Sequence, residues 1–311
     1  MPLDQPQQAS ARFVTVDVFT DRRFGGNPLA VVLDAAGLST REMQAIAAEF
    51  NLAETTFVLP PRSADHTAQI RIFTPRAEMP FAGHPNVGTA FALARERLAA
   101  GAAFPAAMRF EEIAGLVEID LLETGGRPVG ARLRSPQPLT VGDAVAVGVL
   151  ADACSIRSVD IATTRHAPLI AGCGAPFLFA ELANLEALAA ARPRESAFAE
   201  HLPRERAAGV YLYVRTPGGE TDIRSRMFAP LHGIIEDPAT GSAAVALAAL
   251  SAELGKESDV RLSMRIGQAF EMGRRSLLDV VAVKAQGRVI ETFVGGSCVP
   301  VMSGIIELAA S

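Results

Sequence analysis

Two stretches of the sequence repeat each other about half a chain apart. The first runs IRIFTP (Ile70–Pro75) and then HPNVGTA (His84–Ala90), and the second runs RSRMFAP (Arg224–Pro230) and then DPATGSA (Asp237–Ala243). Each Pro-x-x-Gly segment leads into a run rich in alanine and leucine. Self-similarity at a fixed distance is the sequence signature of a duplicated unit. The pattern predicts two similar lobes related by a pseudo-twofold axis.

A third match lies upstream, where GNP (Gly26–Pro28) and GAP (Gly174–Pro176) each precede an apolar run typical of a strand. Three matches in the same order indicate an ancient duplication of the chain. We expect residues 1–130 to form the first lobe, completed by a C-terminal strand at 302–311. Residues 131–301 are expected to form the second lobe.

Short strands and helices alternate around these segments. Val14–Phe19 and Glu54–Leu59 have the apolar patterning of strands. Ser39 and Glu42 have the spacing of a capping box before an amphipathic helix, and Asn51 suits the left-handed end of that helix. Short strands that close round an apolar helix favour an α+β fold over a parallel doubly wound sheet.

The composition excludes several classes of protein. The 311 residues include 29 Lys and Arg against 34 Asp and Glu, for a net charge of −5, and no basic stripe for nucleic acid is present. The longest uncharged runs, Pro238–Ala252 and Thr292–Ile306, are shorter than the ~18–20 residues of a membrane span. Met1–Arg12 lacks the apolar stretch of a signal peptide. We expect a soluble cytoplasmic protein that binds neither nucleic acid nor membranes.

Metal and cofactor sites have little support in the sequence. Cys154, Cys173 and Cys298 are scattered, and the histidines form neither an HExxH nor an HxH pair. A metal site built from distant ligands stays open. No GxGxxG follows a strand, and no phosphate-binding loop or GxSxG elbow occurs. We therefore expect neither a metal nor a cofactor.

The two Pro-x-x-Gly segments have the residues of helix starts. Pro85 and Pro238 suit the first helical position, Asp237 suits the N-cap, and His84 holds the equivalent place. Free amides at such a start bind carboxylates, and the small Gly241 beside Ser242 lets a ligand approach the backbone. Taken alone, each segment is also explained as a well-capped helix. A pseudo-twofold axis would bring both starts to one cleft.

Glu54 opens a predicted strand and allows two interpretations. A carboxylate at the start of a strand is usually solvated. If Glu54 faces the cleft beside apolar walls, burial raises its pKa toward the range useful for acid and base catalysis.

Several of these segments together resemble the PhzF-like phenazine-biosynthesis family. The resemblance covers residue 13 to the end of the chain, in the family's order. It is carried by Val16–Thr20, Gly26–Val32, Glu54–Phe57, Arg71–Pro75, Ala82–Pro85, Glu236–Ala243 and, more weakly, Gln268–Arg274.

The resemblance implies a diaminopimelate-epimerase-like fold, in which each of two lobes wraps a barrel-like sheet round a central helix. It also implies a homodimer without a cofactor. The family's type enzyme isomerises trans-2,3-dihydro-3-hydroxyanthranilate by moving a proton between ring carbons. By the same resemblance Glu54 is the catalytic base and acid. The substrate-binding residues would be His84, Asp237 and Ser242, with backbone amides near Gly83 and Gly241.

We therefore expect an isomerase that moves a proton on a small carboxylate-bearing metabolite. An epimerase or lyase acting on an amino-acid-like substrate is an alternative, as is a noncatalytic binding protein of the same fold. A racemase with two thiols is disfavoured, because none of the three cysteines lies at a predicted helix start. Asn86, Val87 and Arg275 depart from the family pattern beside the site, so the identity of the substrate stays open.

Overall fold

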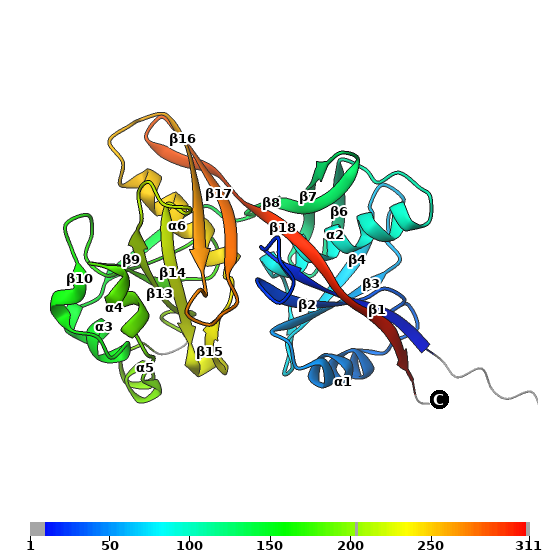
Figure 1. Cartoon of the computed structure of the whole chain (residues 1–311), viewed down its shortest axis with the longest axis horizontal. Coiled ribbons are helices and arrows are strands. Elements are labelled where there is room, and N and C mark those ends of the chain that lie inside the picture. Colours follow the sequence, from blue (N-terminus) through cyan, green and yellow to red (C-terminus); the bar gives the residue numbers. More distant parts are fainter. Residues whose placement is uncertain (1–9, 203–204, 309–311) are drawn as a thin grey trace, which may run out of the picture.

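Two lobes lie side by side and share one long strand (Figure 1). The computed structural model of the chain describes residues 10–202 and 205–308. Residues 1–9 of the predicted first lobe and residues 309–311 of its predicted terminal strand lie outside the described residues. The arrangement confirms the prediction of an α+β fold with two related lobes.

The first lobe is a closed barrel whose strands pair in the order β1–β2–β3–β4–β6–β7–β8–β18 and back to β1. The pairs β2–β3 and β4–β6 are parallel and the others are antiparallel. The elements of this lobe are β1 (Ser10–Val18), β2 (Asn27–Val32), α1 (Thr40–Phe50), β3 (Glu54–Leu59), β4 (Ala68–Phe73), β5 (Glu78–Met79), α2 (Gly83–Ala99), β6 (Ala107–Glu112), β7 (Gly115–Thr124) and β8 (Arg127–Arg134).

The second lobe repeats this order, with strands paired as β9–β11–β12–β13–β14–β16–β17–β18. Its parallel pairs, β12–β13 and β14–β16, are equivalent to the parallel pairs β2–β3 and β4–β6 of the first lobe. The elements are β9 (Thr140–Ala144), α3 (Val147–Ala153), η1 (Ser158–Asp160), β10 (Ile161–Ala162), β11 (Leu169–Gly172), β12 (Phe177–Leu182), α4 (Leu185–Ala190), α5 (Glu195–His201), β13 (Gly209–Arg215), β14 (Ile223–Ala229), η2 (Pro230–His232), β15 (Ile234–Asp237), α6 (Gly241–Glu253), β16 (Val260–Gln268) and β17 (Ser276–Ala285).

The long strand β18 (Arg288–Glu307) belongs to both lobes. Its first part pairs with β17, its middle with β8 and its last part with β1. The predicted boundary between residues 130 and 131 falls inside β8, which stays paired with β7 as far as Leu133. The chain therefore crosses to the second lobe over residues 135–139, while β18 returns to the first lobe.

The strand register shows which residues of the two lobes are equivalent. Leu29 lies beside Glu54 in the first lobe, and Phe177 lies beside Gly209 in the second. Glu54 and Gly209 therefore occupy matching positions at the starts of β3 and β13. The duplicated scaffold carries a carboxylate in one lobe and no side chain in the other.

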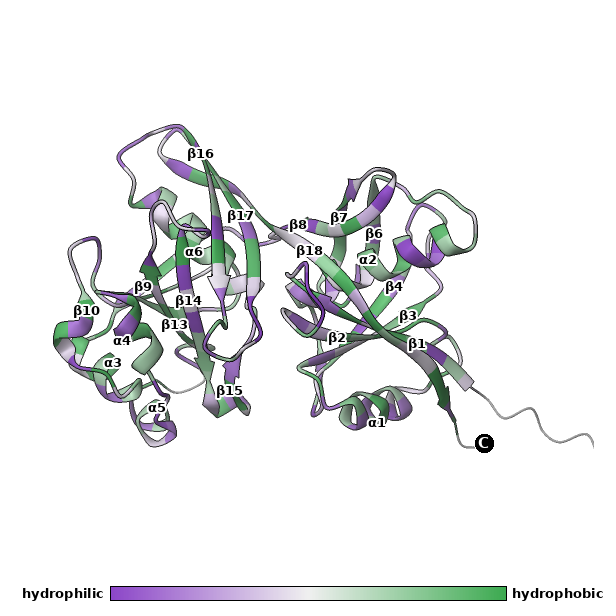
Figure 2. Ribbon diagram, in the orientation of Figure 1, coloured by the Kyte–Doolittle hydropathy of each residue, from purple (hydrophilic) through white to green (hydrophobic). Residues whose placement is uncertain are grey.

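Each barrel encloses one helix. Every residue of α6 from Ala243 to Leu250 is buried, and α2 is buried from His84 to Ala92. A helix that is apolar all round needs a partner on every side, which the surrounding sheet supplies. Figure 2 shows α6 mainly in green, whereas α1, which packs on the outside of its barrel, has both green and purple parts. Within the described residues, no helix is long and apolar enough to cross a membrane.

The packing of α2 against its barrel requires glycine at position 88. A Cβ atom there would lie 2.6 Å from Leu29 Cδ2 and 2.7 Å from Val18 Cγ2, both in the core. We predict that Gly88→Ala lowers the free energy of unfolding by roughly 1–3 kcal/mol, since overpacking outweighs the gain in helix propensity. Gly148→Ala in α3 is the matched control, because no atom lies within 4 Å of its added Cβ. Urea unfolding should show slight stabilisation by Gly148→Ala. Equal stabilisation by Gly88→Ala and Gly148→Ala would contradict the prediction.

Candidate active site between the lobes

Residues from both lobes meet where β2, β3, α2 and β15 come together. Asn27, at the start of β2, donates from Nδ2 to Asp237 Oδ1 of the second lobe at 3.0 Å and to the Ala239 carbonyl at 3.0 Å. Glu54 Oε2 lies 3.5 Å from His84 Nε2. The charge of Asp237 also acts on Glu54. The structure thus brings Glu54, His84 and Asp237 to one place.

The buried carboxyl oxygen of Glu54 has no hydrogen-bond partner. Its side chain is 15% exposed, and its Oε2 atom is buried and accepts no hydrogen bond. Burial, and then the negative charge of Asp237, raise the pKa of Glu54 to about 8. This carboxyl group is therefore mostly protonated at neutral pH and ionises just above it. A pKa near the operating pH suits a group that must both accept and return a proton.

His84 is neutral in the same space. Its side chain is 7% exposed, and burial lowers its pKa to about 3. The separation of 3.5 Å from Glu54 is longer than an ordinary hydrogen bond, and His84 Nε2 has no other partner. A neutral imidazole can donate to or accept from a substrate without adding charge to the site.

Asp237 is buried but well hydrogen-bonded. Thr240 Oγ1 donates to Asp237 Oδ2 at 2.5 Å, and Asn27 serves the other oxygen. Burial raises the pKa of Asp237 to about 6, although these donors oppose the rise. Asp237 therefore ionises at a lower pH than Glu54, and its charge then disfavours a second ionised carboxylate beside it.

The two helices begin at other residues than the sequence predicts. Gly83 is the first residue of α2 and Gly241 is the first residue of α6. The prediction that Pro85 and Pro238 occupy the first helical positions is wrong, because Pro85 is the third residue of α2 and Pro238 precedes α6. His84 corresponds to Ser242, since each is the second residue of its helix.

Asp237 is likewise not the N-cap of α6. It is the last residue of β15, where it pairs with Met227, just as Met79 pairs with Ile72 in the first lobe. The N-cap is Thr240, whose hydroxyl donates to Asp237 and accepts no bond from the first turn of the helix. Asp237 is therefore equivalent to Met79 and not to His84.

The first turns of both helices keep amides that no capping side chain serves. The side chain of neither N-cap residue, Ala82 or Thr240, accepts a hydrogen bond from a backbone amide of its helix. Free amides at the positive end of a helix suit a carboxylate. Ser242 is partly exposed in the first turn of α6, and its hydroxyl bonds to none of the described residues.

Gln268 supports the second lobe's half of the site, a role that its place in the weakest family segment did not reveal. Its Nε2 donates to the Asp237 carbonyl at 2.8 Å and to Thr240 Oγ1 at 3.0 Å. Its Oε1 accepts from the Thr240 amide at 3.1 Å and from Tyr211 Oη at 3.2 Å. The amide thus fixes the turn from Asp237 to α6. In the sequence, the signal for this role is a glutamine side chain at the end of a strand.

A second contact between the lobes holds the loop that leads to Asn27. Arg274 donates to Asp17 Oδ1 at 2.7 Å, to the Gly25 carbonyl at 2.8 Å and to the Gly26 carbonyl at 3.0 Å. Asp17 is buried, and the charge of Arg274 opposes the rise in pKa that burial causes. This clamp keeps Asn27 against Asp237.

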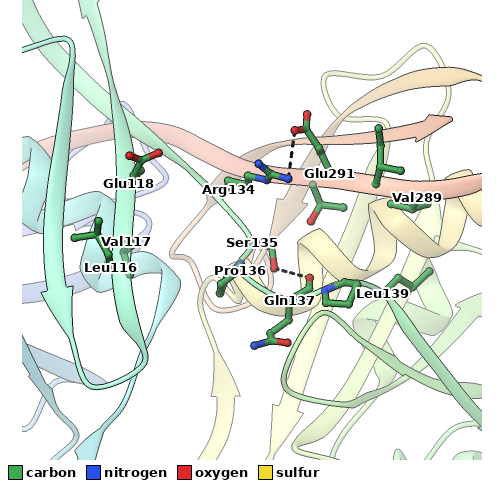
Figure 3. A pocket seen from close by; sticks show the side chains of 13 residues that line it. Leu116, Val117, Glu118, Arg134, Ser135, Pro136, Gln137, Leu139, Val289 and Glu291 are labelled. Carbon is green, nitrogen blue, oxygen red and sulfur yellow. Dashed lines mark hydrogen bonds and ion pairs between the residues drawn. The ribbon is translucent and has the colours of Figure 1, made fainter.

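A separate hollow of about 450 Å³ lies where the lobes join on β7 and β18 (Figure 3). The ion-paired side chains of Arg134 and Glu291 line it, and the connection Ser135–Leu139 forms one wall (Figure 3). None of the predicted site residues lines it. Among the described residues, no group of three or more His, Cys, Asp or Glu side chains is placed to hold a metal ion.

The chain is similar to known proteins over most of its length. The family model PhzC-PhzF, described as phenazine biosynthesis-like protein, matches residues 16–304. An uncharacterized isomerase of Mesorhizobium japonicum is 39% identical over 94% of this chain and 97% of its own. The trans-2,3-dihydro-3-hydroxyanthranilate isomerase of Pseudomonas chlororaphis is 36% identical over 89% of this chain and 91% of its own. The crystal structure of a PhzF-family phenazine biosynthesis protein of Bacillus anthracis has a TM-score of 0.86 at 25% identity, covering 96% of this chain and 100% of its own.

The hydrogen bond from Asn27 stabilises the charged form of Asp237. We predict that Asn27→Ala raises the pKa of Asp237 above about 6, by roughly one further unit. Titration of the Asp237 carboxyl carbon by NMR would measure the shift. Asn184→Ala, which removes the N-cap of α4, is the control for a loss of stability without a change in the site. The same pKa shift in both variants would contradict a specific role for Asn27.

Proposed function

Because the chain belongs to the PhzC-PhzF family of phenazine biosynthesis-like proteins and is an isomerase, we propose that it moves a proton within a small carboxylate-bearing metabolite. The reaction would resemble that of trans-2,3-dihydro-3-hydroxyanthranilate isomerase, the name carried by several relatives. We also propose that the protein is cytoplasmic, as its composition indicates, and that it is a homodimer without a cofactor, as the sequence resemblance implies.

One observation carries the proposal: polar atoms without partners gather at the site. Asn27 Oδ1, Glu54 Oε2 and His84 Nε2 are all buried and make no hydrogen bond. Buried polar atoms are nearly always satisfied in folded proteins, so such a group of exceptions calls for a ligand. A substrate with several polar groups would supply the missing partners.

In the proposed mechanism the carboxylate of Glu54 removes a proton from one carbon of the substrate. The same group, now a carboxylic acid, returns the proton to another carbon. His84 and Asp237 hold polar groups of the substrate and direct the return of the proton. Ser242 and the amides near Gly83 and Gly241 bind the substrate carboxylate.

The duplicated scaffold favours a single proton-transferring group. Gly209 occupies the position equivalent to Glu54, and a Cβ there would lie 2.6 Å from the Phe228 carbonyl oxygen. The second lobe therefore cannot carry an equivalent base at that position. This asymmetry favours a proton shift over an epimerisation that uses matched bases on opposite faces of one carbon.

Replacement of Glu54 tests the proposal directly. We predict that Glu54→Gln lowers turnover and deuterium uptake from D2O by roughly 10²–10⁴-fold while ligand binding persists, because an amide cannot accept the proton. NMR of wild type and variant with small carboxylates, including dihydro-hydroxyanthranilate and proline derivatives, would measure both quantities. Glu118→Gln on the exposed part of β7 is the control.

The outcomes of this experiment separate the alternatives. Activity that survives in Glu54→Gln would rule out the role of Glu54. Inversion at one carbon, or elimination, would identify an epimerase or a lyase instead of an isomerase. Binding without exchange in the wild-type protein would favour a noncatalytic binding protein.

The pH dependence follows from the pKa of Glu54. A general base acts in its ionised form, so kcat/KM should rise about tenfold per pH unit and level off above a pKa of about 8. If Glu54 acted first as an acid, kcat/KM would instead fall above that pH. A pH profile of kcat/KM between pH 5.5 and pH 10 is the measurement, with the range chosen to span roughly two units on either side of that pKa.

A further inference from the structure

Another carboxyl group with buried oxygens, that of Glu112, lies near Asn86 in the first turn of α2. Glu112 is the last residue of β6, and both its carboxylate oxygens are buried without a hydrogen-bond partner. The turn that follows is tied to the segment before α2, because the Ala114 amide donates to the Pro80 carbonyl. Burial raises the pKa of Glu112 to about 8, and the Asn86 side chain is the polar neighbour that opposes this rise.

Asn86 links this carboxyl group to the first turn of α2. It is fully buried, and its Nδ2 donates to the Ala82 carbonyl at 3.0 Å. Its Oδ1 is buried and has no partner. The amide nitrogen must face Ala82, so the unpartnered oxygen needs a donor from elsewhere. An ionised Glu112 has no hydrogen to donate.

A neutral Glu112 would supply the donor that Asn86 Oδ1 lacks. Its O–H would donate to Asn86 Oδ1, and its carbonyl oxygen would be free to accept the second hydrogen of Asn86 Nδ2. We propose that Glu112 is a positioning residue, a carboxylic acid that stays protonated and pairs with the Asn86 amide to fix the first turn of α2. That turn carries His84, which lies two residues from both Ala82 and Asn86.

In the second lobe a different side chain has the equivalent role at the start of the central helix. Ala68 of β4 and Ile223 of β14 are equivalent. Gln69, one residue after Ala68, pairs with Glu111, and Ser225, two residues after Ile223, pairs with Gln268. Because β6 and β16 run parallel to these strands, the counterpart of Gln268 is the residue after Glu111, which is Glu112. Gln268 is a neutral side chain that both donates and accepts at the turn before α6. Glu112 can do the same for α2 only as a protonated acid.

The proposal is tested first without any activity measurement. In difference infrared spectra at pH 7, the wild-type protein should show a carbonyl stretch of a protonated carboxyl group that Glu112→Gln removes and Glu118→Gln retains. Glu112→Gln should keep the melting temperature within about 1 °C, because an amide can donate to Asn86. Glu112→Met should lower it by roughly 3–6 °C, because Asn86 then loses its donor.

Activity supplies the second readout and rests on the proposed function. Glu112→Gln should keep kcat/KM within about twofold of the wild-type value. Folded Glu112→Met should lose roughly 10- to 100-fold, since a small displacement of His84 misplaces the reacting groups. If Glu112→Met does not fold, Asn86→Leu takes its place with the same expected losses.

Three results would overturn the proposal: no change of the infrared band in Glu112→Gln, equal destabilisation by Gln and Met, or full activity in folded Glu112→Met. The infrared and melting results do not depend on turnover. They therefore stand even if Glu54→Gln shows that the proposed isomerase mechanism is wrong.

Discussion

The burial of Glu54 beside Asp237 is the constraint on which the site depends. Two carboxyl groups share a space between the lobes, and the charges that act on Glu54 include no described cation to offset the cost of ionising it. Asp237 has donors on both of its oxygens, so it carries the negative charge first. Glu54 is consequently left as the group whose proton is exchangeable near neutral pH.

The carboxyl groups of Glu54 and Asp237 stay close together only if the two lobes keep a fixed relative position. The hydrogen bonds of Asn27 and Arg274 cross directly from one lobe to the other near the site. β18 joins the lobes a second time, since it pairs with β17, β8 and β1 in turn. Two barrels that each enclose a helix can then present both helix starts to one space without a flexible connection between them.

Much of this arrangement could be predicted from sequence, because its signals are local. The duplication, the capping box of Ser39 and Glu42 and the left-handed end of α1 at Asn51 are all present in the structure. The helix starts could not be placed correctly, because matching prolines and glycines paired Asp237 with His84. The pairing of Asp237 with Met227, and the hydrogen bonds of Gln268, keep residues 237–240 out of the helix. Both are contacts between residues distant in sequence.

The same comparison explains how duplication yielded an asymmetric site. Under the pseudo-twofold relation Glu54 corresponds to Gly209, His84 corresponds to Ser242, and Asp237 corresponds to Met79. Each pair places a group that can ionise in one lobe and one that cannot in the other. Because only one member of each pair can change its charge near neutral pH, a bound substrate meets two unlike faces. A scaffold with twofold symmetry can therefore direct a proton to one carbon in preference to another.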